Sequence, residues 1–135
     1  MPMTSTVLRE GGESYANPFV GPINHPAHVK IDVSGLTTAE VDEYGYLKPG
    51  LPLTALGARV TAGFVYGVTI EAVRIVDRNP TNVSLAADTS DPLIAVATIG
   101  MVNRDIAEDN LGRAYTAAEI AGFDAAGSKL VLTTT

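Results

Sequence analysis

Apolar and polar residues alternate along several stretches of the chain, and this alternation predicts β-strands. From Val29 to Val33 every second side chain is apolar, which is the pattern of a half-buried strand. The stretch from Tyr66 to Val76 alternates in the same way until its phase slips at Ala72 and Val73, which predicts a β-bulge there. Leu93 to Val102 is apolar at nearly every position and predicts a strand in the middle of the fold, covered on both faces.

Shorter elements are expected between and after these strands. Gly45 to Leu53 is rich in turn residues and predicts two short strands on either side of a Pro-Gly turn. Asp77 to Pro92 predicts a polar loop, in which Val83 and Leu85 could form one edge strand. Lys129 to Thr133 predicts a closing strand.

Two sequences resemble helix capping boxes, in which a Thr and a Glu three residues later satisfy backbone donors at a helix start. Thr37 to Glu40 predicts one short helical turn, and Thr116 to Glu119 predicts a longer helix that ends at Gly122 or Gly127. The fold class is therefore mainly β with one or two short helices.

The first 28 residues differ in character from the rest. Four of the eight prolines fall here, and proline removes a backbone donor and favours extended neighbours, so the segment predicts neither a helix nor a central strand. We expect an extended N-terminal arm over residues 1–28 and a β-rich domain over residues 29–135. Tyr15, Phe19, Val20 and Ile23 give the arm large apolar side chains, which either fold back onto the domain or contact a partner.

The composition narrows the classes of partner. Apolar residues make up 46% of the 135 residues and charged residues 18%, which favours a folded chain of one domain. The net charge of −6 and the absence of a basic cluster argue against binding nucleic acid. The longest apolar stretch is shorter than the roughly 20 residues that cross a bilayer, and no secretory signal is visible, so we expect no membrane association.

The sequence offers little for catalysis or for a cofactor. There is no cysteine, no phosphate-binding or dinucleotide-binding motif, and no serine in a nucleophile elbow. His25 and His28 flank Pro26, and no nearby carboxylate completes a metal set, so we expect two exposed polar residues. Two acidic clusters are expected to be solvated rather than catalytic, namely Glu40, Asp42 and Glu43, and Asp105, Glu108 and Asp109. These features favour a binding protein without cofactor or metal over an enzyme.

From about Tyr15 onward the order of these features resembles the lambda-type head decoration proteins of tailed phages. The resemblance is carried by Tyr15-Ala16-Asn17-Pro18-Phe19, the strand at Val29 to Val33, Leu47-Lys48-Pro49-Gly50-Leu51-Pro52-Leu53, Tyr66-Gly67-Val68-Thr69-Ile70-Glu71-Ala72-Val73, Ala97-Thr98-Ile99-Gly100-Met101-Val102-Asn103, and the helix and strand from Thr116 to Leu132. The chain departs from the family pattern in lacking tryptophan and in its long polar loop from Asp77 to Pro92.

The resemblance implies a small barrel-like β-domain called a β-tulip and a structural role without enzymatic activity. It implies a homotrimer on the outer surface of an expanded capsid, made in the host cytoplasm, that stabilises the virion by binding the major capsid protein. The N-terminal arm would add to strands of that protein, with contacts from Tyr15, Asn17, Pro18, Phe19, Val20 and Ile23. No small-molecule substrate is implied.

Two alternatives remain open at the level of sequence. The chain could be another oligomeric virion part, such as the base of a head fibre or a tail protein. It could also be an oligomeric β-barrel that binds a small ligand, although no group of convergent polar residues in an apolar stretch marks such a site.

Overall fold

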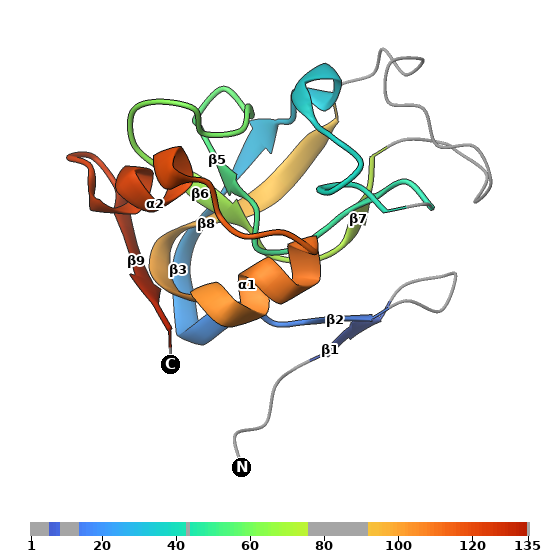
Figure 1. Cartoon of the computed structure of the whole chain (residues 1–135), viewed down its shortest axis with the longest axis horizontal. Coiled ribbons are helices and arrows are strands. Elements are labelled where there is room, and N and C mark those ends of the chain that lie inside the picture. The colour runs from blue at the N-terminus through green and yellow to red at the C-terminus, as the bar shows by residue number, and fades with distance from the viewer. Residues whose placement is uncertain (1–5, 9–13, 43, 76–91, 135) are drawn as a thin grey trace.

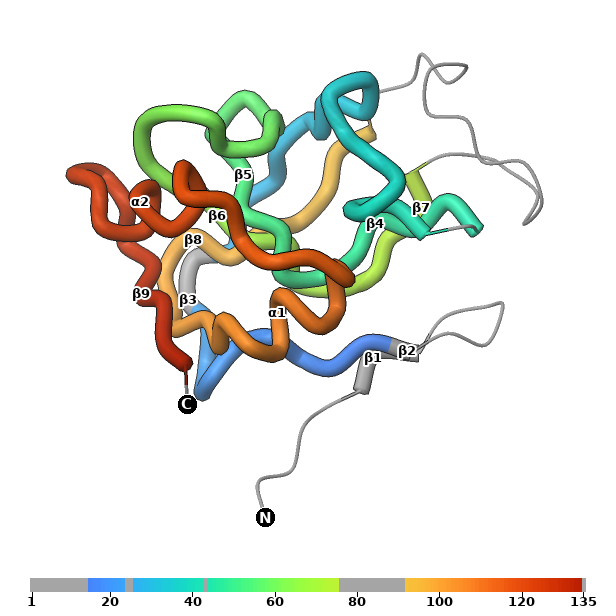
Figure 2. Tube along the Cα trace, viewed as in Figure 1, coloured from blue at the N-terminus to red at the C-terminus, as the bar shows by residue number. Residues whose placement is uncertain are grey.

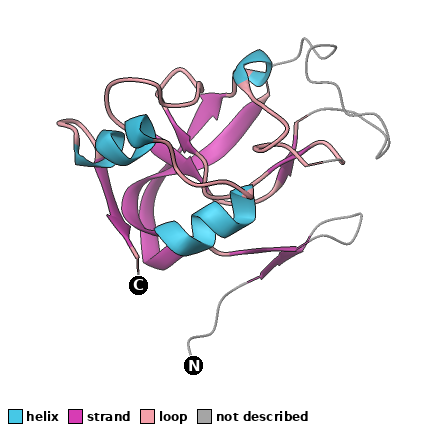
Figure 3. Ribbon diagram, viewed as in Figure 1, coloured by secondary structure: helices cyan, strands magenta, loops and turns pink. Residues whose placement is uncertain are grey.

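The computed structural model describes residues 6–8, 14–42, 44–75 and 92–134. Its strands form a five-stranded sheet and two smaller two-stranded sheets, and its two short helices lie near the C-terminal end of the chain. This composition confirms the mainly β fold class (Figure 3). The predicted loop at Asp77 to Pro92, with its edge strand near Val83 and Leu85, lies almost wholly outside the described residues.

Short strands and turns dominate the chain, and only β3 and β8 are long. In chain order the described elements are β1 (Thr6–Leu8), β2 (Ser14–Ala16), β3 (Phe19–Lys30), a 3₁₀ turn η1 (Val33–Gly35), β4 (Tyr46–Leu47), β5 (Pro52–Leu53), β6 (Gly67–Thr69), β7 (Val73–Arg74), β8 (Leu93–Asn103), α1 (Arg104–Leu111), α2 (Ala117–Asp124) and β9 (Lys129–Thr133).

Strand β8 is the centre of the five-stranded sheet. It pairs antiparallel with β3 along nearly its whole length, antiparallel with β6 through Ala97 and Val96, and parallel with β9 from Ile99 to Asn103. Because β3 occupies one edge of β8, strands β6 and β9 must share the other edge in succession. The prediction of a central strand is confirmed, but the expected cover on both faces is not complete, since Leu93 and Met101 are exposed.

The five-stranded sheet does not close into a barrel among the described strands. Its order is β3-β8-β6-β5, and in the part of the chain that the structure describes the end strands β3 and β5 are not paired with each other. The apolar interior is formed by side chains from every part of the domain; among those with no exposed surface are Ile31, Val33, Leu47, Leu51, Leu53, Val65, Val68, Val96 and Val102.

The phase slip near Ala72 marks a change of sheet rather than a bulge. Strand β6 pairs with β8, whereas β7 pairs with β4 in a separate sheet, and residues 70–72 between them belong to no strand. The prediction located the irregularity correctly but assigned it the wrong structure. The two short strands around the Pro-Gly turn are confirmed as β4 and β5, which likewise enter different sheets.

Of the two predicted helices, one is confirmed and the other is a turn. The capping box at Thr116 and Glu119 is present and opens α2, which ends at Asp124, so Gly122 lies inside the helix instead of stopping it. Thr37 and Glu40 also exchange hydrogen bonds, but they close a turn and not a helix. Strand β9 is confirmed at Lys129–Thr133.

Gly57 fixes the approach of one loop to strand β3. Its φ of +79° is unfavourable for a side chain, and a Cβ at this position would lie 2.0 Å from the carbonyl oxygen of Lys30. Gly63 has nearly the same φ, +78°, but a Cβ there would meet nothing within 4 Å. The two glycines therefore share a conformational requirement and differ in the space around them.

We expect Gly57→Ala to lower the free energy of unfolding by about 2 kcal/mol more than Gly63→Ala, because only the former adds overlap with backbone to the strain of a positive φ. Urea unfolding of both variants measures the difference. Equal losses would show that the loop moves away from β3 at little cost.

Candidate binding surface

The N-terminal segment is attached to the domain at several points. The amide of Asn110, in α1, forms two bonds to the backbone of Ala16: its Nδ2 donates to the Ala16 carbonyl at 2.7 Å, and its Oδ1 accepts from the Ala16 N–H at 3.1 Å. The Tyr15 hydroxyl donates to Asp42 at 2.8 Å in a buried contact. Strand β2 is thus held against α1 and the loop before β4, beyond the five-stranded sheet (Figure 1).

Strand β1 lies outside this attachment. It pairs antiparallel with β2, from Thr6 opposite Ala16 to Leu8 opposite Ser14, and within the described residues it pairs with no other strand. Figure 1 shows this two-stranded sheet at the periphery of the molecule, and Figure 2 shows the chain that follows β2 running beside α1 before it enters β3. The outer edge of β1 therefore has no strand beside it in the described part of the chain, and no proline interrupts it.

At Asn17 and Pro18 the chain leaves the two-stranded sheet and turns toward the five-stranded sheet. The Asn17 side chain accepts from the Phe19 N–H at 3.0 Å, as in an Asx turn, and the Pro18 carbonyl accepts from the Asn103 N–H at 2.7 Å. After this turn the chain enters the main sheet as β3, so the expected division at residue 28 falls within a strand. Strand β3 is an edge strand, which is where Pro22 and Pro26 can be accommodated.

A bulge in β3 opens a groove beside this edge. Val20 pairs with Met101 and Asn24 with Ile99, so four steps along β3 match two along β8, and two residues are extra. Gly21, with a φ of +76°, allows the turn that the bulge requires. The resulting groove has a volume of about 290 Å³ and is lined by Asn17, Phe19, Gly21, Pro22, Ile23, Ile70 and Glu71.

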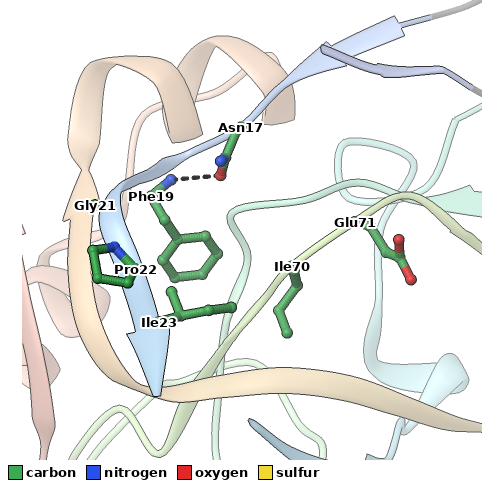
Figure 4. Close-up of a pocket in the computed structure, with 7 residues that line it drawn as sticks. All are labelled: Asn17, Phe19, Gly21, Pro22, Ile23, Ile70 and Glu71. Carbon is green, nitrogen blue, oxygen red and sulfur yellow. Dashed lines mark hydrogen bonds between the residues drawn. The ribbon is translucent and has the colours of Figure 1, made fainter. Parts of the chain in front are cut away.

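The groove is apolar except at its ends. Figure 4 shows the Phe19 ring and the Ile23 side chain facing Ile70, with the carboxylate of Glu71 beyond them and Asn17 on the other side. Ile23 packs over the backbone of Gly100, where an added Cβ would lie 3.2 Å from its Cγ2. The change of sheet after β6 is what places Ile70 and Glu71 opposite the arm.

The predicted arm residues are therefore dispersed. Tyr15 and Phe19 are buried in their own domain and Pro18 is buried as well, whereas Val20 is exposed. Of the six predicted contact residues, the groove brings together Asn17, Phe19 and Ile23. Val20 points to a different surface, the outer face of the sheet, where its neighbour Met101 is also exposed.

A second hollow lies where β6 and β9 separate along β8. It has a volume of about 440 Å³ and is lined by Phe64, Tyr66, Thr98, Ile99, Gly127 and Lys129. Strand β6 ends its pairing at Ala97 and β9 begins at Ile99, so Thr98 forms the floor of a notch in the sheet. Among the residues that line it, Lys129 carries the charge.

One of the two acidic clusters is not solvated as expected. Glu40 and Asp42 are buried, whereas Glu43 lies outside the described residues. Glu40 accepts from the Thr37 N–H at 2.7 Å and from Arg113 at 2.9 Å, and Arg113 also forms two bonds with buried Glu119. The expectation failed because Arg113, 73 residues away in sequence, supplies the compensating charge.

These contacts decide the ionisation of Glu40. Burial alone would raise the pKa of Glu40, but the hydrogen bonds from Thr37 and Arg113 and the charge of Arg113 outweigh it, so the pKa lies below its ordinary value of 4.5. The arrangement is a structural ion cluster in which each carboxylate is held by backbone or guanidinium donors. Burial also raises the pKa of the Tyr115 hydroxyl, which donates to the Gly50 carbonyl at 2.6 Å.

Neither a metal cluster nor a membrane-spanning helix occurs among the described residues. No group of three or more His, Cys, Asp and Glu side chains in these ranges could hold a metal ion, and His28 lies exposed on β3. No described helix is long and apolar enough to span a bilayer.

Comparison with protein-family models, with curated proteins and with solved structures finds no match for this chain.

We expect Asn110→Leu to detach β2 from α1, because leucine keeps the approximate volume but removes both bonds to Ala16. The free energy of unfolding should fall by about 1 to 3 kcal/mol, since backbone groups of Ala16 lose their partners. Asn110→Asp keeps the acceptor for the Ala16 N–H but places a carboxylate oxygen against the Ala16 carbonyl, so it should also be destabilised. Hydrogen exchange at the Ala16 amide measures the attachment directly, and unchanged protection in the leucine variant would contradict it.

A second prediction concerns acid stability. Because the pKa of folded Glu40 is lowered, its ionised form stabilises the protein above the ordinary carboxyl pKa, and this contribution is lost as the pH falls through and below that value. Glu40→Gln should therefore reduce the loss of unfolding free energy between neutral pH and pH about 3, measured by urea unfolding at each pH. Asp109→Asn makes the same chemical change at an exposed position of α1 and serves as the control for the substitution itself. If Glu40→Gln left the pH dependence of the unfolding free energy unchanged, Glu40 would be excluded as a source of the acid instability.

Proposed function

We propose that the chain is a structural virion protein that trimerises on the outer surface of an expanded phage capsid and stabilises it, with the N-terminal segment adding to strands of the major capsid protein. The proposal rests on the sequence resemblance to lambda-type head decoration proteins and on one structural observation. That observation is the small β1–β2 sheet, which is held to the domain at Tyr15 and Ala16 and leaves the outer edge of β1 without a partner among the described strands.

The attachment of β2 changes the energetics of such an arm. Ordering five free residues would cost roughly 5 to 10 kcal/mol of backbone entropy, which a partner would have to offset. Because β2 is already fixed by Asn110 and Asp42, the cost of ordering β2 is met when the domain folds, and the partner has to offset only the ordering of β1. The apolar burial of Tyr15 and Phe19 then serves the fold, and the partner contact in this proposal is the backbone of β1.

The edges of the two sheets support β1 as the strand that receives the partner. Strand β3 also has an edge with no strand beside it among the described residues, but Pro22 and Pro26 lack backbone donors, as is typical of edges protected against strand addition. Thr6–Leu8 carries no such protection. Backbone pairing would supply affinity, and three linked arms would raise the avidity about 10² to 10⁴ over a single arm.

The test is sedimentation of the purified protein with expanded and with unexpanded heads of the virus that encodes it. We expect co-sedimentation with expanded heads alone. Deleting residues 1–8 removes β1 but keeps β2 and its contacts with Asn110 and Asp42, and it should weaken binding at least about tenfold through the loss of avidity.

Leu56→Lys provides the matched control, because Leu56 is 85% exposed and lies in the turn after β5. It should bind heads as the parent does. If the deletion variant bound expanded heads with the affinity of the parent, β1 would have no part in attachment. Equal binding to both kinds of head, or to neither, would contradict decoration itself.

A further inference from the structure

An exposed apolar row crosses the outer face of the sheet on three adjacent strands. Val20 on β3 pairs with Met101 on β8, and Met101 pairs with Val131 on β9, so the three side chains lie side by side. Their exposed fractions are 41%, 40% and 56%. Contiguous exposed apolar side chains of this kind are typical of a surface that contacts another protein.

The row continues into the notch at Lys129. Ile99 lies two residues before Met101 on the same face of β8, pairs with Lys129, and lines the notch together with Phe64, which is also partly exposed. We call the surface formed by Val20, Ile99, Met101, Lys129 and Val131 the basic face. Lys129 is the one charged residue of these five, and in a protein of net charge −6 such a face is where another copy can approach with least repulsion.

The groove beside the bulge of β3 forms an adjacent surface of opposite charge. It adjoins the basic face, since Gly21 and Pro22 directly follow Val20. Its apolar wall is Ile23 and Ile70, and its charge is the exposed carboxylate of Glu71 (Figure 4). We call this surface the acidic groove.

We propose that the basic face of one copy docks on the acidic groove of the next, with Lys129 opposite Glu71, and that three such contacts close a ring. This inference rests on the proposed trimer, because a three-fold ring needs two different surfaces that meet head to tail. The two surfaces adjoin at Val20 to Pro22, which would then lie toward the three-fold axis. Opposite charges fix the register and reject contacts between like faces.

Charge exchange tests the pairing. Glu71→Lys and Lys129→Glu should each weaken self-association about tenfold or more in sedimentation equilibrium, because each places like charges together, and the double variant should recover it. Lys30→Glu and Asp109→Lys reverse exposed charges outside both surfaces and should associate as the parent does. Failure of the double variant to recover, or equal loss in the controls, would overturn the pairing.

Cross-linking tests the geometry independently, because the chain has no cysteine of its own. An equal mixture of Glu71→Cys and Lys129→Cys, treated with a short bismaleimide, should give a covalent dimer, while neither variant alone should. The variant with both changes should give a product of three chains. A dimer from Lys129→Cys alone would indicate a two-fold contact, a ladder of longer products would indicate an open filament, and no product would exclude the contact; each of these overturns the ring.

The results separate this inference from the proposed function. Closed trimers that fail to sediment with expanded heads would support the ring contact and contradict the proposed decoration of a capsid. If both single charge reversals still bound heads and the cysteine mixture gave no cross-linked dimer, decoration would be supported and the ring contact would be contradicted.

Discussion

The pairing of β8 with three other strands is the constraint on which the rest of the structure depends. Strand β3 covers one edge of β8, while β6 and β9 divide the other edge between them. The division creates the notch at Thr98, and the surplus of two residues in β3 creates the acidic groove. Both surfaces therefore follow from register, which is fixed by the buried residues of β8 such as Val96 and Val102.

The elements that could be predicted from the sequence are those whose signals are local. The continuous apolar run of β8 and the capping box of α2 each depend on neighbours within a few residues. The alternation from Val29 to Val33 is also local, but the strand it predicts is wrong in its bounds, because β3 runs from Phe19 to Lys30 and Val33 begins the 3₁₀ turn η1. Helix α1 is not among the predicted elements although its signals are also local: Asn103 caps its start, Asp105 stands in its first turn and Gly112 ends it in a left-handed conformation. Its acidic residues indicate a solvated cluster of charges, and this interpretation does not predict the helix that they belong to.

The site could be predicted only in part because its geometry depends on contacts between distant residues. The sequence marks the arm residues as apolar side chains without a local core, but it predicts Ile70 and Glu71 within a continuous strand. Whether Tyr15 and Phe19 face a partner or their own domain depends on Asp42 and on the core around β8, which no pattern in the first 28 residues reveals. The burial of Glu40 depends in the same way on Arg113.

The antiparallel pairing of β3 with β8 also has a consequence for how the chain folds. Phe19 to Lys30 must find Leu93 to Asn103, so even the nearest pair, Lys30 and Leu93, closes a loop of nearly half the chain before any of its burial is gained. Folds dominated by such distant pairing form slowly compared with helical proteins of similar size. During synthesis the first strand of the main sheet has to wait for its partner to leave the ribosome, and Pro22 and Pro26, which lack backbone donors, limit its pairing with a wrong neighbour in the meantime.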